Sequence, residues 1–290
     1  MTTTVAAMSE ITRVAPWSLR ALGYSFGIAE RAVRFLAWAE AVHGQMLRTL
    51  RTHEQEITRS TSLPPAVRSR NGQRAWHIDA GCKYLLEVGP PAIDLLTCDV
   101  RTRGAGHIAL ANACGGGLLA ALCDLAARRH IGCIAICRAG DRDDLPYDWG
   151  RLGWLAALPS KSRTLFLRGT GKPDAALILS LVRPWSGPVD GVDEAAIRED
   201  VGRVLEGLHC AYIGLSGFRP NPAVIEAQAA LGRLAHGDLH ALDYADRLAA
   251  AYRSGVEVDL VDLVHLYELE KRTWAPTSER SRAQAGYGQY

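Results

Sequence analysis

The pattern of apolar runs between residues 93 and 137 constrains the fold more than any other feature of this chain. One run, Ile93-Asp-Leu-Leu-Thr-Cys-Asp99, precedes a glycine-bearing turn at 101–106 and a stretch rich in Ala and Leu at 109–129. A second run, Ile131-Gly-Cys-Ile-Ala-Ile-Cys137, follows. A strand, a turn, a helix and a strand within about 45 residues form a parallel βαβ unit. The pattern therefore predicts an α/β fold, with a mixed sheet built on this central parallel βαβ unit.

The first part of the chain predicts a helical layer. Hydrophobic side chains recur at three- and four-residue steps from Gly27 to Glu54, as in an amphipathic helix. Gly44 lies inside this pattern, where a glycine costs about 1 kcal/mol relative to alanine. We therefore expect a break or a bend at His43–Gly44. Residues 55–75 have little periodicity, so we expect a surface connection there.

The second half of the chain predicts two more strands and then helices. The strands are expected at 165–167 and 175–182, joined as a hairpin through 169–174. Helices are expected at 194–209, 221–235, 239–253 and 260–269. We divide the chain into an N-terminal helical segment (1–70), an α/β core (71–193) and a C-terminal helical region with a polar tail (194–290).

Composition narrows the class of partner. The chain has 33 basic and 31 acidic residues, interspersed along its 290 positions, which argues against nucleic acid. No stretch approaches the roughly 20 apolar residues of a membrane-spanning helix, and the beginning does not resemble a secretion signal. Seven cysteines lie mostly within apolar runs and never as C-x-x-C. We interpret them as reduced thiols of a cytoplasmic protein without a metal site.

Two groups of residues are candidates for chemistry. His43, beside a glycine at the end of a helix, could titrate near neutral pH as an acid or base, or could be a half-buried or capping histidine. Gly104, Gly106 and His107 lie in a turn expected to open a helix, where backbone N–H groups could hold a phosphate; the alternative is a tight turn. The run Cys114-Gly-Gly-Gly117 lies too far along the chain to complete a dinucleotide fingerprint.

A third group follows the second predicted strand. Asp141, Asp143 and Asp144 could bind a hard cation or a substrate amine, or could belong to a solvated loop. Because the carboxyl ends of parallel strands meet at one edge of a sheet, we expect 104–107 and 138–144 to line one cleft.

The segment Ala41-Val-His-Gly-Gln-Met-Leu-Arg48 resembles the Ser-His-Gly motif, closely followed by arginine, of the malate/L-lactate dehydrogenase family, a family that includes ureidoglycolate dehydrogenases and imino-acid reductases. The order of turn, helix and strand over 99–137 is also similar. The resemblance implies that His43 is the acid or base and that Arg48 meets the substrate carboxylate. It also implies a homodimer, with NADPH or NADH held near Gly104.

The chain departs from that family at three places. Val42 stands in place of the serine, and the arginine is displaced by one position. The family's Asn-Ser-x-His-Phe-Gly segment is replaced by Arg138-Ala-Gly-Asp-Arg-Asp143. Arg138 is a further candidate for substrate binding, and Asp141 is a candidate catalytic residue. The tail Ala275-Pro-Thr-Ser-Glu-Arg-Ser-Arg282 is similar to an uncharacterised bacterial family, known as a domain of unknown function.

These features predict a nicotinamide-dependent reductase or dehydrogenase of a small 2-oxo, 2-hydroxy or cyclic imino acid. Two alternatives keep the same fold. One is a cofactor-independent hydrolase, lyase or isomerase of a small carboxylate, with His43 paired to Asp141, Asp143 or Asp144 as acid and base. The other is a non-catalytic binding subunit.

Overall fold

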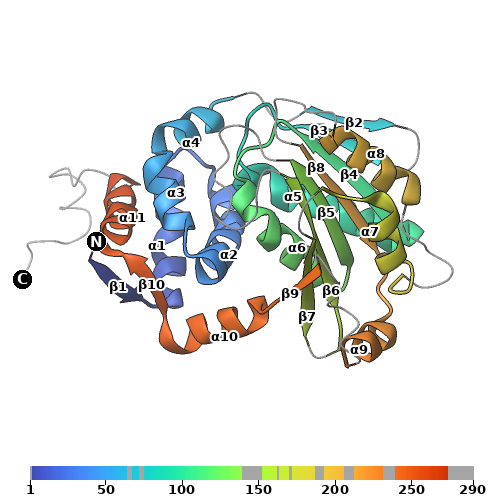
Figure 1. The fold of residues 1–290 in the computed structure, drawn as a ribbon. Coiled ribbons are helices and arrows are strands. Elements are labelled where there is room, and N and C mark those ends of the chain that lie inside the picture. Colours follow the sequence, from blue (N-terminus) through green and yellow to red (C-terminus); the bar gives the residue numbers. More distant parts are fainter. Residues whose placement is uncertain are drawn as a thin grey trace, which may run out of the picture.

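An eight-stranded mixed sheet occupies the right-hand half of the molecule in Figure 1, with strand order β2-β3-β4-β8-β5-β6-β7-β9. The computed structural model describes residues 2–63, 67–71, 75–138, 152–161, 163–169, 172–186, 193–205, 212–230 and 239–273. The strands of the sheet are β2 (Val67–Asn71), β3 (Ala75–Asp79), β4 (Ala105–Ala111), β5 (Gly132–Arg138), β6 (Leu152–Pro159), β7 (Thr164–Gly169), β8 (Tyr212–Phe218) and β9 (Leu239–Leu242).

Helices cover both faces of the sheet. On one face α5 (Leu85–Arg103) and α6 (Leu119–Ala127) pack against the strands, and α2 (Phe26–His43) packs on these two helices. The opposite face is covered by α7 (Ala175–Val182) and α8 (Glu194–Leu205). Each face therefore has its own apolar core.

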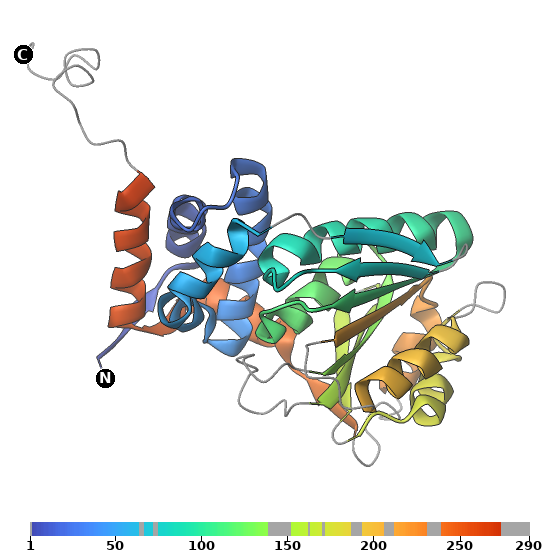
Figure 2. The ribbon, with the colours of Figure 1, turned by 90° about the horizontal axis from the view of Figure 1, so that it is seen from above.

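A helical layer lies at one end of the sheet (Figure 2), built from both ends of the chain. A small sheet of β1 (Thr3–Ala6) and β10 (Val256–Asp259) joins the two ends, since the strands pair antiparallel. The remaining helices are α1 (Met8–Ala21), α3 (Met46–Thr52), α4 (Glu54–Thr61), α9 (Pro222–Ala230), α10 (Tyr244–Ser254) and α11 (Leu260–Thr273). The α/β class, the mixed sheet and the helical N- and C-terminal layers are as expected from sequence.

The position of the parallel unit was predicted wrongly. Residues 93–99 belong to helix α5, and the beginning of the expected helix is strand β4. Ile93, Leu96 and Val100 are buried at helical spacing, and so short an apolar run does not distinguish a helix from a strand. The parallel pair is β3 with β4, and α5 is its crossover. The expected strand at 131–137 is confirmed as β5.

β8 is one of the strands that the sequence analysis missed. It lies between β4 and β5, antiparallel to both, and all of its residues are buried. Gly217 faces α5, where a Cβ would lie 2.9 Å from Leu96 Cγ. Gly214 faces α8, where a Cβ would lie 1.9 Å from Asp200 Oδ2. The glycines that weaken the strand signal are therefore the residues that let both helices pack closely.

Two more assignments in the second half are corrected. Residues 175–182 form helix α7, because Asp174 caps it by accepting from the N–H of Ala176 at 2.8 Å. The helix expected at 239–253 begins as strand β9, and only α10 is helical. The strand at 165–167 is confirmed within β7, and the described parts of 194–209, 221–235 and 260–269 are helical as predicted. The domain boundaries at residues 70 and 193 stay a prediction.

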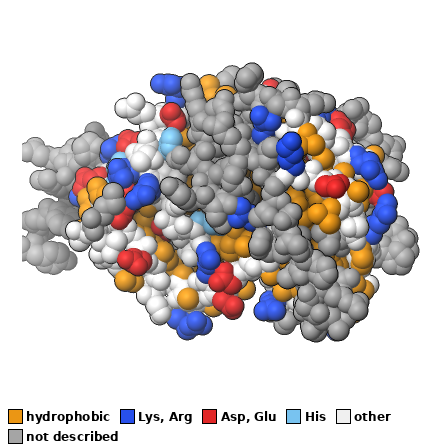
Figure 3. Space-filling model, in the orientation of Figure 1, with side chains coloured by type: hydrophobic (Ala, Val, Ile, Leu, Met, Phe, Trp, Pro, Cys, Tyr) orange, Lys and Arg blue, Asp and Glu red, His pale blue; other side chains and the backbone are white. Residues whose placement is uncertain are grey.

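Basic and acidic side chains are interspersed among the coloured residues of the face in Figure 3. Within the described ranges, no helix combines the length and the apolar character needed to cross a membrane.

The close approach of β8 and α5 gives a first testable prediction. Gly217→Ala should lower the free energy of unfolding by about 1–3 kcal/mol, because the new methyl group overpacks the contact with Leu96. Gly202→Ala is the matched control, since its added Cβ would meet no atom within 4 Å beyond the neighbouring residues and backbone of its own helix. In helix α8 it should raise stability by up to about 1 kcal/mol. Urea unfolding followed by circular dichroism measures both. Equal midpoints for the two variants would contradict this account of β8.

Candidate functional site

The helix that carries His43 ends where the sequence predicted a break. Gly44 adopts φ 66°, the left-handed conformation that favours glycine, and its N–H donates to Glu40 O at 2.7 Å. The next helix, α3, begins at Met46. His43 is thereby the last residue of α2.

Glu40 joins the two helices across this break. Its carboxylate is buried (2% exposed) and accepts the N–H of Leu47, in the first turn of α3, at 2.8 Å. Burial raises the pKa of Glu40 to about 7, against the lowering effect of the backbone hydrogen bonds from Leu47 and Met46. The direction of the chain after His43 therefore depends on a buried carboxylate.

The imidazole of His43 is half-buried among aromatic rings. Its ring centroid is 5.2 Å from that of Tyr244 and 6.1 Å from that of Trp38, both edge-on. Phe166 completes the group, 6.0 Å from Trp38 and 5.0 Å from Tyr244. This aromatic cluster of Trp38, His43, Phe166 and Tyr244 connects α2, β7 and α10.

Two arginines that the sequence analysis did not single out lie next to the aromatic cluster. Arg247 of α10 donates from Nη1 to the carbonyl of Val42, the residue before His43, at 3.2 Å. Its side chain is 53% exposed and also pairs with Asp243. Arg168 follows Phe166 by two positions on β7, so both side chains are on one face of the sheet. No sequence spacing links these residues to His43, because α10 and β7 reach it through the tertiary fold.

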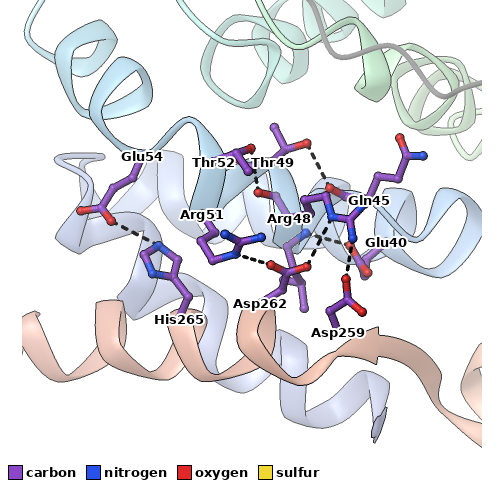
Figure 4. A network of polar contacts seen from close by, with 11 residues as sticks. Glu40, Gln45, Arg48, Thr49, Arg51, Thr52, Glu54, Asp259, Asp262 and His265 are labelled. Atoms are coloured by element: carbon purple, nitrogen blue, oxygen red, sulfur yellow. Dashed lines mark hydrogen bonds and ion pairs between the residues drawn. The ribbon is translucent and has the colours of Figure 1, made fainter. Parts of the chain in front are cut away.

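Arg48, in contrast, faces β10 and α11 (Figure 4). Its guanidinium lies 2.5 Å from Asp259 Oδ2 and 3.9 Å from Asp262 Oδ2. Arg51 pairs with Asp262 at 2.5 Å, so the two arginines hold α3 against the C-terminal layer. The substrate-binding role expected for Arg48 is not supported by this placement.

Gly104 and Gly106 lie at the amino end of β4, and not in a turn that opens a helix. Gly104, with φ 85°, ends helix α5, and its carbonyl accepts the N–H of Arg219 at 3.2 Å. A helix C-terminus presents carbonyl groups, which repel a phosphate. At Gly106 a Cβ would lie 2.8 Å from Asp99 Cβ, so this glycine serves close packing. The geometry on which their cofactor-binding role depended is therefore absent.

His107 belongs to a buried polar cluster beneath α8. It is 4% exposed, and its Nδ1 lies 3.2 Å from Ser216 Oγ on the neighbouring strand. Its Nε2 lies 3.4 Å from Asp200 Oδ1, which also accepts the hydroxyl of Tyr212 at 2.7 Å. Burial lowers the pKa of His107, but the hydrogen bond and charge of Asp200 outweigh it and leave the pKa above the ordinary value. The cofactor role expected for His107 is not supported, since its ring is enclosed.

The sheet separates His43 from Arg138. Phe166 of the aromatic cluster belongs to the apolar core on the α2 side of the sheet. Arg138 is on the opposite side. It faces α8, because its Nη1 donates to Val204 O at 3.1 Å.

Gly106, another member of the expected cleft, is not brought to His43 either. Gly106 is four strands from β7 in the sheet order, or about 19 Å. Asp141, Asp143 and Asp144 lie outside the described residues. Within the described ranges, no group of three or more His, Cys, Asp or Glu side chains is arranged to hold a metal ion.

The glycine turn that does open a helix is at 112–117. It follows the carboxyl end of β4 and leads through a 3-10 turn, η1 (Gly116–Leu118), into α6. Gly115 has φ 88°, and Asn112 Nδ2 donates to Asp79 Oδ1 at 2.9 Å, which joins the carboxyl ends of β3 and β4. The expected strand-to-helix turn therefore exists, but it is formed by the glycines at 115–117. The sequence analysis had placed these too far along the chain to complete a dinucleotide fingerprint.

The end of α2 lies beside this glycine turn. Arg31 and Arg129 both pair with Asp94, while Trp38 interacts with Asp124. α2 and α6 are therefore antiparallel, which brings the C-terminal half of α2 to the beginning of α6, and α2 packs against η1.

No family model and no curated protein matches the chain. Solved structures match over almost its whole length. Malate dehydrogenase from Pyrococcus horikoshii OT3 has 13% identity and a TM-score of 0.65, over 94% of this chain and 97% of that one. Sulfolactate dehydrogenase from Methanocaldococcus jannaschii has 14% identity and a TM-score of 0.60, over 93% and 97%. Δ1-Piperideine-2-carboxylate reductase from Pseudomonas syringae pvar. tomato has 12% identity and a TM-score of 0.57, over 92% and 99%.

The chain thus shares the fold of these dehydrogenases and this reductase, and the expected resemblance to the malate/L-lactate dehydrogenase family is confirmed at the level of structure. The resemblance of the tail to a bacterial family of unknown function stays a prediction.

The buried Glu40 predicts how stability changes with pH. Its folded-state pKa of about 7 exceeds the ordinary 4.5, so the folded protein binds this proton more tightly than the unfolded chain does. The resulting stabilisation is complete below pH 4.5 and is lost as pH rises through 7. Glu40→Gln removes the titration. The stability of the natural protein relative to this variant should fall by about 2–3 kcal/mol from about pH 4 to pH 8; a difference that stays constant with pH would show that Glu40 is not the group responsible.

The placement of Arg48 predicts a structural effect. Arg48→Ala should lower the free energy of unfolding by about 1 kcal/mol, because Asp259 loses its partner at a partly exposed site. Ligand affinity should not change. Thermal melting measures the stability, and titration calorimetry measures the affinity for a carboxylate ligand. A loss of that affinity at unchanged stability would support the expected role of Arg48 in substrate binding.

Proposed function

We propose that this chain is a nicotinamide-dependent reductase or dehydrogenase of a small 2-oxo, 2-hydroxy or cyclic imino acid. The observation that carries the proposal is the position of His43, half-buried at the break of α2, beside a glycine turn at the carboxyl ends of β3 and β4. In open α/β sheets such an edge is where ligands bind. The fold is shared with enzymes named for malate, sulfolactate and Δ1-piperideine-2-carboxylate, which are all small carboxylates.

In this proposal His43 is the acid or base. An imidazole changes charge near neutral pH, so it can give a proton to the substrate oxygen or nitrogen and take it back in the reverse direction. Its Nε2 is enclosed by protein, and we assign the proton exchange to Nδ1. The rings of Trp38 and Tyr244 orient the imidazole and exclude water from one side of it.

The substrate carboxylate is assigned to Arg247. Its guanidinium lies next to His43, because it donates to the carbonyl of Val42, and half of its side chain is exposed. A guanidinium keeps further N–H donors for a carboxylate. Arg168, on the same face of β7 as Phe166, would add positive charge to this side of the site. Arg247 takes the role that the sequence motif had assigned to Arg48.

The residues at 115–117 fit the phosphate part of a nicotinamide cofactor. Three successive glycines leave the backbone open at the amino end of α6, where the helix dipole favours an anion. A Cβ at Gly115 would lie 3.2 Å from the ring of Tyr84, so a side chain there would crowd the turn. NADPH or NADH supplies the hydride when bound, while this chain supplies the proton and the carboxylate contact.

We also propose that the protein is a cytoplasmic homodimer. The free and fully buried thiols of Cys123 and Cys133 fit a reducing compartment, and dimerisation is what the family resemblance implies.

The second candidate is a non-catalytic binding subunit on the same fold. It is favoured by the ion pairs of Arg48, since the arginine of the family motif is committed to Asp259. The cofactor-independent hydrolase, lyase or isomerase depends on Asp141, Asp143 or Asp144, which lie outside the described residues.

The test combines cofactor binding with two variants. The melting temperature should rise with NADPH or NADH, and a panel of oxaloacetate, sulfopyruvate and Δ1-piperideine-2-carboxylate should reveal turnover. His43→Ala should abolish turnover, while Arg247→Ala should raise KM about tenfold to a hundredfold, the effect of one charge-assisted hydrogen bond. Arg59→Ala, at an exposed position on α4, is the control.

An unchanged melting temperature with both NADPH and NADH, together with no turnover of any compound in the panel, would contradict the proposal. Saturable binding of these carboxylates without turnover would favour the binding subunit instead.

A further inference from the structure

A cavity of about 370 Å³ lies between α2, α5 and α6, in the half of α2 that precedes Trp38. Four arginines line it, Arg31 and Arg34 from α2 and Arg128 and Arg129 from the end of α6. Only two acidic side chains, Glu30 and Asp124, line it with them. The cavity is therefore rich in positive charge, in a chain whose total charge is close to zero.

Three of these arginines are oriented by carboxylates. Asp94 pairs with Arg31 and, at 2.6 Å, with Arg129, so the two guanidinium groups converge. Arg128 lies 2.5 Å from the carboxylate of Asp124. A guanidinium has five N–H donors, and a carboxylate that holds one edge leaves the others for a second anion.

Arg34 differs from the other three. It is exposed and forms no ion pair with any residue in the described ranges. It lies one helical turn after Arg31, on the same side of α2. Arg34 therefore adds a positive charge that is not held in an ion pair by a carboxylate of the described residues.

The remaining wall of the cavity is apolar. Phe35 and Trp38 come from α2, Pro90 from α5 and Leu125 from α6. The volume is within the range of cavities that hold small organic ligands, which are mostly apolar with a few charged groups. An anion with an apolar group beside it matches both walls, and an inorganic ion would leave the apolar wall uncovered.

The cavity is distinct from the proposed active site. Arg34 precedes His43 by nine positions, about 14 Å along the helix. Trp38 lies between the two sites, since it lines the cavity and its ring centroid is 6.1 Å from that of His43.

We propose that this cavity binds a small organic anion, whose carboxylate or phosphate is held by Arg34 and its neighbouring arginines and whose apolar group packs against Trp38 and Phe35. This site goes beyond the proposed reaction and does not depend on it. A ligand bound in the cavity would contact Trp38, whose ring also contacts His43.

Calorimetric titration with phenylphosphate, phenylacetate and inorganic phosphate tests the proposal without cofactor or substrate. One of the two aromatic anions should bind saturably with a 1:1 ratio, and more tightly than inorganic phosphate. Whichever of phenylphosphate and phenylacetate binds more tightly shows whether the site prefers a phosphate or a carboxylate. Arg34→Ala should weaken this binding about tenfold or more, whereas Arg59→Ala should leave it unchanged. Arg34 is exposed, so circular dichroism should show that its variant is folded.

Two further variants keep the result decisive. Trp38→Phe should abolish the change in tryptophan fluorescence on binding, while heat of binding remains. Arg247→Ala, next to His43, should bind the anion as the natural protein does. Binding that survives Arg34→Ala but is lost with Arg247→Ala would assign the anion to the other site and overturn the proposal, as would the absence of binding by either aromatic anion.

Discussion

The insertion of β8 between β4 and β5 is the constraint on which the rest of the structure depends. β4 and β5 run in the same direction and would form a parallel pair, but each bonds to β8 instead. The two glycines of β8 allow this arrangement. The missing side chain of Gly217 lets α5 pack closely on one face of the sheet, and that of Gly214 leaves room for Asp200 of α8 on the other face. A side chain at Gly217 would displace α5, and one at Gly214 would displace α8. Either change would loosen the packing of the apolar core between that helix and β8.

This arrangement decides which residues can meet. The helix α5 occupies residues that looked like a strand, so the turn at Gly104 comes to the amino end of β4, and the turn at 112–117 comes to its carboxyl end. The end of α2 reaches the second turn, because α2 and α6 are antiparallel. His43 therefore lies near the later glycines and away from Gly104, His107 and Arg138, which face other parts of the sheet.

Helix α2 links the two sites that we propose. Its C-terminal end carries His43, oriented by rings from β7 and α10, and its N-terminal half carries two of the arginines around the cavity. The buried Glu40 sets the direction of the chain after His43 by capping α3. Trp38 is shared by the aromatic cluster and the cavity, so a ligand in the cavity would contact a side chain that also contacts His43.

The sequence by itself determined the fold class, the break at His43–Gly44, the strand at 131–137 and the likeness of the 41–48 segment to an oxidoreductase family, because periodicity and a helix-ending glycine are local properties. Local pattern could not separate the apolar helix α5 from a strand, or find β8, whose glycines make sense only once α5 and α8 pack on them. Arg247, Arg168 and Tyr244 reach His43 from segments distant in the chain, and Arg48 is drawn to Asp259 across the layer that the two termini build. Those contacts were decided by tertiary structure alone, since which charge or ring meets which depends on strand order and helix direction, and these are set by packing of the whole chain.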